Sequence, residues 1–400
     1  MGPGPGRFTV NEMVARPRIC LVVGYLGRGG LEKQAFLLGR GLMRRGFNVA
    51  VVSLSVGGAW AAALNEEGIP VLELRRRSHF DIGRFARLVA AFRNMRPDLV
   101  YAFNYPTTVY ARLAGLVASV PLLVTGERCV YLTRVQGILE RLLARLTECV
   151  ICNADAIRRD LVERIGIPDS KVITVLNAIE PRPAVGAEEK RSARALLGIP
   201  EDVLVIGTVG RIEDQKNLPM LVDVACLARR EGLPAWFCSI GSGSRIGALR
   251  SMIRARGVDD CFVLAGERPN VAELLPAFDV FVLTSRYEGL PNAVMEAMVA
   301  GLPCVCTDVG GCRELVEEGA SGFLVPSGDA ERMMQRVRQL HRDAASRAAM
   351  GSAGRARILR DFSIERLVSL TEDVLRSLLA ARDAGPRGRR LSVRSAAAIE

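Results

Sequence analysis

The chain has 400 residues, of which 49% are hydrophobic, which exceeds what a single core usually accommodates and favours two domains. No apolar run approaches the roughly 18 residues that a membrane-spanning helix requires, and residues 1–17 lack the apolar middle of a signal peptide. We therefore expect a protein of the cytoplasm that does not span a membrane.

Positive charge is concentrated in the first half of the chain. The net charge is +11; residues 1–185 hold 25 Lys and Arg against 15 Asp and Glu, and residues 186–400 hold 29 against 28. This asymmetry favours an anionic partner for the first half, such as a membrane surface or a phosphate-bearing acceptor. Nucleic acid is not expected, because neither a base-stacking motif nor a zinc-finger spacing is present.

Short apolar runs alternate with helical patterns along the chain. The expected strands lie at 18–26, 48–56, 69–74, 98–103, 121–126, 149–154 and 172–177, and then at 203–210, 235–241, 261–266, 280–285, 303–308 and 322–326. The runs are continuously apolar, as expected when helices cover both faces of a parallel sheet. The sequence therefore predicts an α/β protein with two doubly wound, Rossmann-like parallel sheets.

The predicted domains cover 1–185 and 186–383, and the basic tail at 384–400 is predicted to be disordered. The break falls within 175–190, where prolines and charges replace the apolar pattern. Ligands of doubly wound sheets bind outside the carboxyl ends of the strands, so a ligand is expected in the cleft between the sheets.

Ten cysteines raise the question of a metal site. The closest pairs are Cys149 with Cys152 and Cys304 with Cys306, and both pairs lie inside strand-like runs without a nearby histidine. We interpret them as buried, reduced side chains rather than zinc ligands, and we expect no metal.

The segment at 284–308 carries the strongest functional signal. A strand leads into a turn rich in Gly and Pro, and a helix then begins near Pro291 and ends near Gly301. The free N–H groups at the start of this helix would attract a phosphate. Glu288 lies in the turn, and Glu296 lies one turn inside the helix, where it can accept hydrogen bonds from a ribose.

The sequence EGLPNAVME is similar to the paired-glutamate motif of family 4 glycosyltransferases, which have the GT-B fold of two facing domains. The resemblance implies a nucleotide diphosphate-sugar donor, a UDP-sugar, and transfer with retention of anomeric configuration, without a cofactor. It assigns donor binding to Glu288, Gly289, Leu290, Asn292 and Glu296, with Glu288 nearest the reacting sugar.

A second element, GTVGRIEDQKN at 207–217, places Arg211 and Lys216 in a loop after a strand. Taken alone, the two cations fit a solvated basic loop. In the family, a similar arrangement clamps the donor diphosphate, and the resemblance assigns that role to Arg211 and Lys216. Fixed cations would stabilise the charge that develops on the departing diphosphate.

Two glycine-rich turns complete the predicted donor site. Gly29 and Gly30 lie between the first strand and a helix, where backbone can approach a phosphate closely, and the segment resembles the Gly-Gly-x-Glu signature of the family. Gly241, in SIGSGS, resembles the family's glycine beneath the nucleotide. The resemblance is nearly continuous over 203–329 and patchier in the first half.

On the acceptor side the chain departs from the family. Members often carry a histidine after Pro-Asp at the fourth strand, but Tyr101 and Phe103 stand there, and no role is assigned to His79 or His341. The departing phosphate oxygen can instead accept the proton of the incoming hydroxyl. Glu127 is an alternative acceptor-side residue.

The expected acceptor is a growing surface polysaccharide or a lipid-linked saccharide. Two alternatives remain open: a nucleotide-sugar epimerase of the same shape, which would convert the donor without an acceptor, and a catalytically idle nucleotide-binding homologue. An NAD-dependent oxidoreductase is disfavoured because neither half has Gly-x-Gly-x-x-Gly. A metal-dependent glycosyltransferase with one sheet is disfavoured because Asp-x-Asp is absent.

One predicted helix has two interpretations. Residues 84–96 form an apolar stripe made of Phe85, Leu88, Val89, Phe92 and Met95. The stripe can cover the first sheet or, bordered by arginines, can dock on an anionic membrane.

Overall fold

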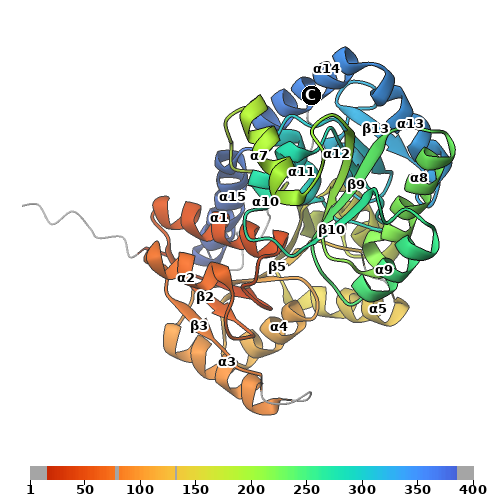
Figure 1. Cartoon of the computed structure of the whole chain (residues 1–400). Coiled ribbons are helices and arrows are strands. Elements are labelled where there is room, and N and C mark those ends of the chain that lie inside the picture. The colour runs from red at the N-terminus through yellow and green to blue at the C-terminus, as the bar shows by residue number, and fades with distance from the viewer. Residues whose placement is uncertain (1–15, 77–80, 131–132, 385–400) are drawn as a thin grey trace, which may run out of the picture.

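The computed structural model describes residues 16–76, 81–130 and 133–384, which form two α/β domains (Figure 1). The tail predicted to be disordered lies outside the described residues except for residue 384. His79 also lies outside them. Within the described ranges, none of the helices combines the length and the apolar character needed to cross a membrane.

The first domain is built on a seven-stranded parallel sheet in the order β3-β2-β1-β4-β5-β6-β7. Its strands are β1 (Arg18–Val23), β2 (Asn48–Ser53), β3 (Val71–Glu73), β4 (Leu99–Phe103), β5 (Leu122–Glu127), β6 (Cys149–Cys152) and β7 (Val172–Thr174). Its helices are α1 (Gly30–Arg44), α2 (Ala59–Glu66), α3 (Ile82–Met95), α4 (Thr107–Val117), α5 (Arg134–Leu143) and α6 (Asp155–Arg159), with short turns η1 (Ala144–Leu146), η2 (Asp160–Ile165) and η3 (Asp169–Lys171).

The second domain repeats this plan with six parallel strands in the order β10-β9-β8-β11-β12-β13. Its strands are β8 (Leu204–Val209), β9 (Ala235–Ile240), β10 (Phe262–Gly266), β11 (Val280–Leu283), β12 (Cys304–Thr307) and β13 (Gly322–Val325). Its helices are α7 (Ala187–Leu197), α8 (Leu218–Arg230), α9 (Ile246–Ala255), α10 (Val271–Leu274), α11 (Asn292–Val299), α12 (Cys312–Leu315), α13 (Ala330–Arg342) and α14 (Ala344–Asp361), with turns η4 (Asp214–Lys216) and η5 (Leu275–Ala277).

Both sheets begin in the middle and grow outward on both sides, which confirms the predicted doubly wound fold. Every strand lies inside one of the predicted apolar runs except β5, which ends one residue beyond its run, at Glu127. The strand order reverses between β1 and β4 and again between β8 and β11. These two reversal points are where such sheets bind ligands.

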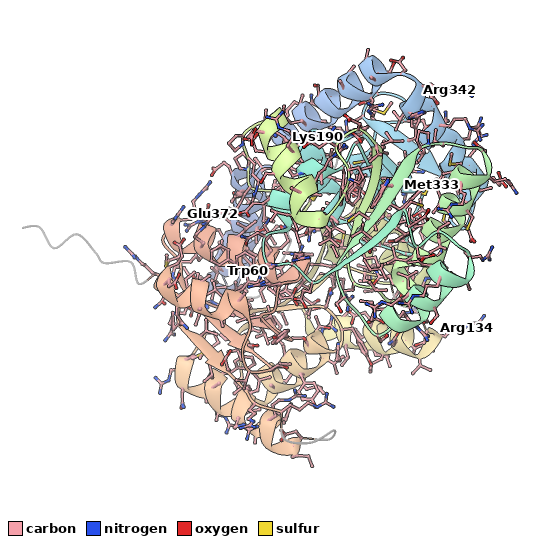
Figure 2. The ribbon with its side chains drawn as sticks, viewed as in Figure 1. Trp60, Arg134, Lys190, Met333, Arg342 and Glu372 are labelled. Atoms are coloured by element: carbon pink, nitrogen blue, oxygen red, sulfur yellow. The ribbon has the colours of Figure 1, made fainter. Side chains whose placement is uncertain are left out.

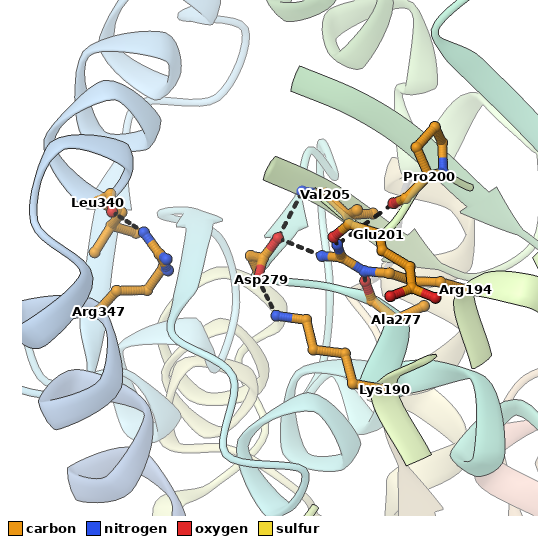
Figure 3. A network of polar contacts seen from close by, with 9 residues as sticks. All are labelled: Lys190, Arg194, Pro200, Glu201, Val205, Ala277, Asp279, Leu340 and Arg347. Carbon is orange, nitrogen blue, oxygen red and sulfur yellow. Dashed lines mark hydrogen bonds and ion pairs between the residues drawn. The ribbon is translucent and has the colours of Figure 1, made fainter. Parts of the chain in front are cut away.

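The helix that opens the second domain is attached to its sheet by one buried carboxylate. Asp279 accepts hydrogen bonds from Lys190 Nζ at 2.5 Å and from Arg194 Nη2 at 2.7 Å, as Figure 3 shows. The same side chain accepts from the backbone N–H of Val205 at 2.8 Å, at the start of β8. Asp279 thereby joins α7 to the first and fourth strands of the sheet, which fixes where the second domain begins.

The last helix, α15 (Ile364–Asp383), returns to the first domain and packs against α1 (Figure 1). Leu367 and Leu375 belong to the hydrophobic core of the first sheet, and Arg45, the C-cap of α1, forms ion pairs with Glu365 and Glu372 of α15. The sequence predicts this helix as part of the second domain, whereas these contacts are all with the first.

The helix at 84–96 is α3, and its apolar stripe covers the first sheet. Leu88, Val89 and Phe92 are buried in the core beside β1 and β4, and Phe85 and Met95 pack against that core. The interpretation of this stripe as a membrane-docking surface is therefore wrong. These side chains already pack against the sheet.

In each of the two closest pairs, both cysteines are buried on a single strand. Cys149 and Cys152 lie on β6, and Cys304 and Cys306 lie on β12. All ten cysteines are free thiols. Burial raises the pKa of Cys149 and of Cys152 to about 12, which keeps both protonated and apolar in character.

Candidate active site

The turn between β11 and α11 holds Glu288 in a fixed position. Lys216 Nζ donates to Glu288 Oε1 at 2.6 Å, and Ser285 Oγ donates to the same oxygen at 2.6 Å. Both members of the ion pair are mostly shielded from solvent, with 17% of the Lys216 side chain and 8% of the Glu288 side chain exposed. A charge-assisted bond in this setting is stronger than one on an open surface.

The loop after β8 is tied to this turn at several points. Thr284 Oγ1 donates to the Lys216 carbonyl at 2.7 Å, and Gln215 Nε2 donates to the Tyr287 carbonyl at 3.0 Å. Arg211 lies exposed in the same loop, and with Lys216 and Ser285 it lines one small pocket. Two cations from the loop thus stand beside the glutamate turn at the reversal point of the second sheet.

Gly241 lies beneath this loop. A Cβ atom at Gly241 would stand 2.0 Å from the carbonyl oxygen of Gly210, and its φ of +142° lies in the region that favours glycine. The backbone N–H of Gly210 donates to the Ile240 carbonyl at 3.0 Å, and that of Ile212 donates to the Ser242 carbonyl at 2.9 Å. The SIGSGS turn therefore supports the Arg211 loop through backbone contacts that a side chain would prevent.

The first domain reaches the site through the start of α1. A Cβ atom at Gly30 would stand 2.1 Å from Asn292 Nδ2, so the first turn of α1 approaches the Asn292 side chain of α11 more closely than any residue but glycine allows. Lys33 Nζ donates to Glu296 Oε1 at 3.2 Å. This bond joins the two domains at Glu296, the residue predicted to bind the ribose. Gly29 is the N-cap of α1, so the positive ends of two helix dipoles lie near each other.

A charge from each domain meets at the same place. Burial raises the pKa of Glu32, in the first turn of α1, and the positive charge of Arg211 on the second domain counteracts that rise. Arg211 therefore lies near the first turn of α1, across the contact between the domains.

The segment that crosses between the domains is held by buried amide side chains. Gln34 Nε2 donates to the Ala178 carbonyl at 2.7 Å, and the Ala178 N–H donates to Gln34 Oε1 at 2.8 Å. Asn177 Nδ2 donates to Asn292 Oδ1 at 3.0 Å and to the Leu290 carbonyl at 3.4 Å. These bonds fix the orientation of Asn292 and of the glutamate turn against the first domain.

The end of β5 forms the first-domain wall opposite Glu288. A Cβ atom at Gly289 would stand 2.0 Å from the carbonyl oxygen of Arg128, so the two domains are in backbone contact here. Glu127, the alternative acceptor-side residue, is buried at the end of β5. Burial raises the pKa of the Cys129 thiol, and the negative charges of Glu288 and Glu127 raise it further, so both carboxylates lie near this thiol.

Tyr101 and Phe103, which occupy the positions where a histidine was expected, are buried aromatic residues of β4. Their ring centroids are 4.3 Å apart, and the guanidinium of Arg128 lies 5.3 Å from the Phe103 ring. The backbone N–H of Arg128 donates to Asn104 Oδ1 at 2.9 Å. The end of β4 therefore holds the Arg128 cation on the aromatic face of Phe103. His341 lies elsewhere, in α13 of the second domain.

The structure gathers the predicted donor-site residues at the contact between the domains. Glu288, Gly289, Leu290, Asn292 and Glu296 lie in the turn and helix after β11, Arg211, Lys216 and Gly241 lie in the two loops beside it, and Gly29 and Gly30 lie opposite on α1. Sequence reasoning missed Lys33, Gln34, Asn177, Arg128 and Ser285. Lys33 and Gln34 directly follow the glycine turn, but nothing in their local pattern indicates a partner in the other domain.

Comparisons with known proteins agree with this geometry. Residues 189–357 match the family model described as Glycosyl transferases group 1, and residues 28–182 match the model described as Glycosyltransferase Family 4. The chain belongs to the family 4 glycosyltransferases. The two matches meet within the crossing segment and include every residue predicted to bind the donor.

Relatives of this glycosyltransferase act in bacterial glycan biosynthesis. The chain is 28% identical over 239 residues to the lipopolysaccharide core biosynthesis glycosyltransferase LpsE of Rhizobium meliloti, an alignment that covers 60% of this chain and just under two thirds (66%) of LpsE. It is 25% identical over 308 residues to the Escherichia coli UDP-Gal:alpha-D-GlcNAc-diphosphoundecaprenol alpha-1,3-galactosyltransferase, covering 74% of this chain and 79% of that enzyme.

Solved structures show the same fold. The structure of Anabaena Alr3699/HepE in complex with UDP-glucose superposes with a TM-score of 0.81 at 20% identity, covering 90% of this chain and 99% of that one. This similarity confirms the GT-B arrangement of two Rossmann-like domains.

Proposed function

We propose that this glycosyltransferase transfers a sugar from a UDP-sugar, with retention of anomeric configuration, to a saccharide or lipid-linked saccharide during surface glycan synthesis. The observation that carries the proposal is the shielded Lys216–Glu288 ion pair, which stands beside Arg211 at the reversal point of the second sheet. Opposite this pair, the first turn of α1 supplies backbone N–H groups from the other domain.

The donor would lie along the contact between the domains. Arg211 and Lys216 bind the diphosphate, and the N–H groups at the starts of α1 and α11 complete its surroundings. Glu296 accepts hydrogen bonds from the ribose, Gly241 leaves space beneath the nucleotide, and Glu288 lies at the sugar. A UDP donor is supported by the complexes of Alr3699/HepE with UDP and with UDP-glucose.

The transfer breaks the bond between the anomeric carbon and the diphosphate, and both electrons of that bond leave with the phosphate oxygen. Arg211 and Lys216 stabilise the resulting charge, which is largest in the transition state. The acceptor hydroxyl attacks from the face that the diphosphate leaves, and the departing oxygen accepts its proton. This route requires neither a histidine nor a metal ion on the enzyme.

The acceptor would approach from the first domain, past Glu127 and Arg128. A lipid-linked acceptor is supported by the E. coli relative, whose name specifies a sugar on diphosphoundecaprenol. We place the reaction in the cytoplasm at the inner face of the membrane. Ten free thiols fit a reducing compartment.

A panel of nucleotides and nucleotide sugars, scored for protection against thermal unfolding, tests the proposal. Ligand at about 100 times its Kd should stabilise the protein by about 2.7 kcal/mol. UDP and UDP-sugars should raise the midpoint of the wild type more than GDP, ADP or NAD, and should have little effect on Arg211→Ala. The exposed Arg250→Ala variant of α9 is the matched control and should be protected like the wild type. Equal protection of Arg211→Ala by UDP would contradict the assigned site.

A further inference from the structure

The outward surfaces of α4 and α5 carry large apolar side chains that nothing in the described chain covers. Val135, Ile138 and Leu142 of α5 are 75%, 62% and 51% exposed. Their spacing places them along one stripe of the helix. Leu113, Leu116 and Val117 of α4 are 41%, 48% and 51% exposed, again on one side of their helix.

The two helices are neighbours and are held in place by a buried ion pair. Arg112 of α4 donates to Glu140 of α5, and both side chains are fully buried. Arg112 Nη2 also donates to Thr125 Oγ1 on β5 at 3.0 Å, so both helices are fastened to the sheet beneath them. The two helices are therefore neighbours fixed to the same sheet, and each leaves its apolar stripe exposed.

The chain segment that carries this surface is also basic. Residues 82–146 contain nine arginines and three acidic residues, and they contain no lysine. Glu127 and Glu140 are buried, and Asp98 is paired with Arg18 and Arg382. The acidic side chains of this segment therefore leave its outer surface to the arginines.

Three arginines border the α5 stripe. Arg134, Arg141 and Arg145 are exposed, and none of them forms an ion pair with any residue in the described part of the chain. Figure 2 shows Arg134 at the outer edge of the molecule, directed away from the protein. We call the α4–α5 face the surface formed by Leu113, Leu116, Val117, Val135, Ile138 and Leu142 together with Arg134, Arg141 and Arg145.

We propose that the α4–α5 face docks on an anionic lipid bilayer, with the apolar side chains in the headgroup layer and the arginines on lipid phosphates. A helix with an apolar stripe bordered by cations is suited to lie in such an interface. A soluble anion would use the arginines but would leave the apolar stripes in water. A second copy of the chain, paired about a twofold axis, would bring the unpaired arginines of two faces together.

The α4–α5 face lies where docking would bring a membrane-bound acceptor to the active site, an argument that rests on the proposed function. α5 follows the end of β5, where Glu127 and Arg128 form the first-domain wall of the site. α4 begins near the end of β1, since a Cβ atom at Gly24 would stand 3.1 Å from Thr107 Oγ1. Both helices therefore start at the cleft edge of the first sheet, and a bilayer held on their outer face would place the headgroup of a lipid-linked acceptor beside that edge.

Co-sedimentation of the full chain with vesicles tests the proposal, using phosphatidylcholine alone and phosphatidylcholine mixed with phosphatidylglycerol. The wild type should bind the mixed vesicles at low salt and should be released near 1 M salt, where the Debye length falls to about 3 Å. Ile138→Ser combined with Leu142→Ser should weaken binding about tenfold or more, and so should Arg141→Gln combined with Arg145→Gln. Matched controls on the second domain, Leu196→Ser and Arg250→Gln with Arg254→Gln, should bind like the wild type.

Failure to bind anionic vesicles at low salt would overturn the proposal, as would equal binding by the α5 variants and their controls. A dimer that the Ile138→Ser and Leu142→Ser variant dissociates, without vesicle binding by the wild type, would mark the face as a self-association surface instead. Protection by UDP, measured without lipid on every variant, separates the two proposals. Vesicle binding without UDP protection would contradict the proposed function alone.

Discussion

The ammonium group of Lys216 lies 2.6 Å from Oε1 of Glu288, although 72 residues separate them in sequence. The lysine comes from the loop after β8 and the glutamate from the turn after β11, so the pair spans the point where the strand order of the second sheet reverses. Ser285 donates to the same carboxylate oxygen. Glu288 is thereby fixed before any ligand binds, as preorganised electrostatic catalysis requires.

Replacing Glu288 by Gln should separate binding from turnover. The amide keeps an oxygen that can accept from Lys216 and Ser285 but removes the negative charge at the sugar. We expect kcat to fall about 100-fold to 1,000-fold, as for loss of one preorganised electrostatic contact, while the affinity for UDP stays close to that of the wild type. Steady-state rates and calorimetry with UDP measure the two effects. A variant with normal turnover would remove Glu288 from the chemistry, and Glu331→Gln on the surface of α13 is the control.

Lys33 should act on the donor only through Glu296. Glu296→Ala removes a charged hydrogen bond to the ribose, worth about 1.5–3 kcal/mol, and should weaken UDP binding about tenfold or more. Lys33→Ala should weaken binding less, because Glu296 remains but loses its partner at 3.2 Å. The double variant should bind no worse than Glu296→Ala. Calorimetry with UDP on the wild type, the two single variants and the double variant completes a double-mutant cycle. Additive losses of binding free energy would show that Lys33 contacts the donor by itself.

Activity should not depend on a divalent metal. Arg211 and Lys216 can neutralise the diphosphate, and the sequence lacks Asp-x-Asp. Transfer rates should therefore be unchanged after dialysis against EDTA. Complete loss of activity that manganese restores would place the enzyme in the metal-dependent class.

Glu314 should make stability depend on pH. Burial raises its pKa from 4.5 to about 7, although backbone N–H groups of Asp155 and Ala156 oppose the rise. The folded protein thus holds this proton more tightly than the unfolded chain does. The stabilisation that the bound proton gives the folded state is complete below about pH 4.5 and is lost as the pH rises through 7. The loss amounts to at most about 3 kcal/mol.

Glu314→Gln removes that titration and serves as the test. Urea midpoints of the variant should rise relative to those of the wild type between pH 4.5 and 8, and Glu331→Gln should follow the wild type throughout. If the urea midpoints of the wild type and of Glu314→Gln change in parallel with pH, the raised pKa of Glu314 is contradicted.

The fold was readable from sequence because each buried strand is a continuous apolar run between turn signals. The surface role of a helix was not readable in the same way. α3 and α5 both carry an apolar stripe, yet Phe92 is buried under the first sheet and Ile138 is exposed. A stripe reports that one side of a helix is apolar, and only the packing of its neighbours determines whether that side is covered.

The donor site was predictable where its residues follow strands and glycines locally. Glu288, Lys216 and Arg211 lie beside recognisable turns, so their meeting at one sheet edge follows from the topology. Lys33 and Glu296 are 263 residues apart and lie on different domains. Their contact depends on how the domains face each other, and hydrophobic periodicity carries no information about that orientation.

The most direct test of the central claim is proton NMR of a reaction that contains the enzyme, an α-linked UDP-sugar and a lipid-linked saccharide acceptor. The anomeric proton of the donor should disappear only when acceptor is present, and the new glycosidic proton should have the coupling constant of an α-linkage. Conversion of the donor without acceptor would identify an epimerase. A β-linked product would contradict the retaining transfer proposed for Glu288, Lys216 and Arg211.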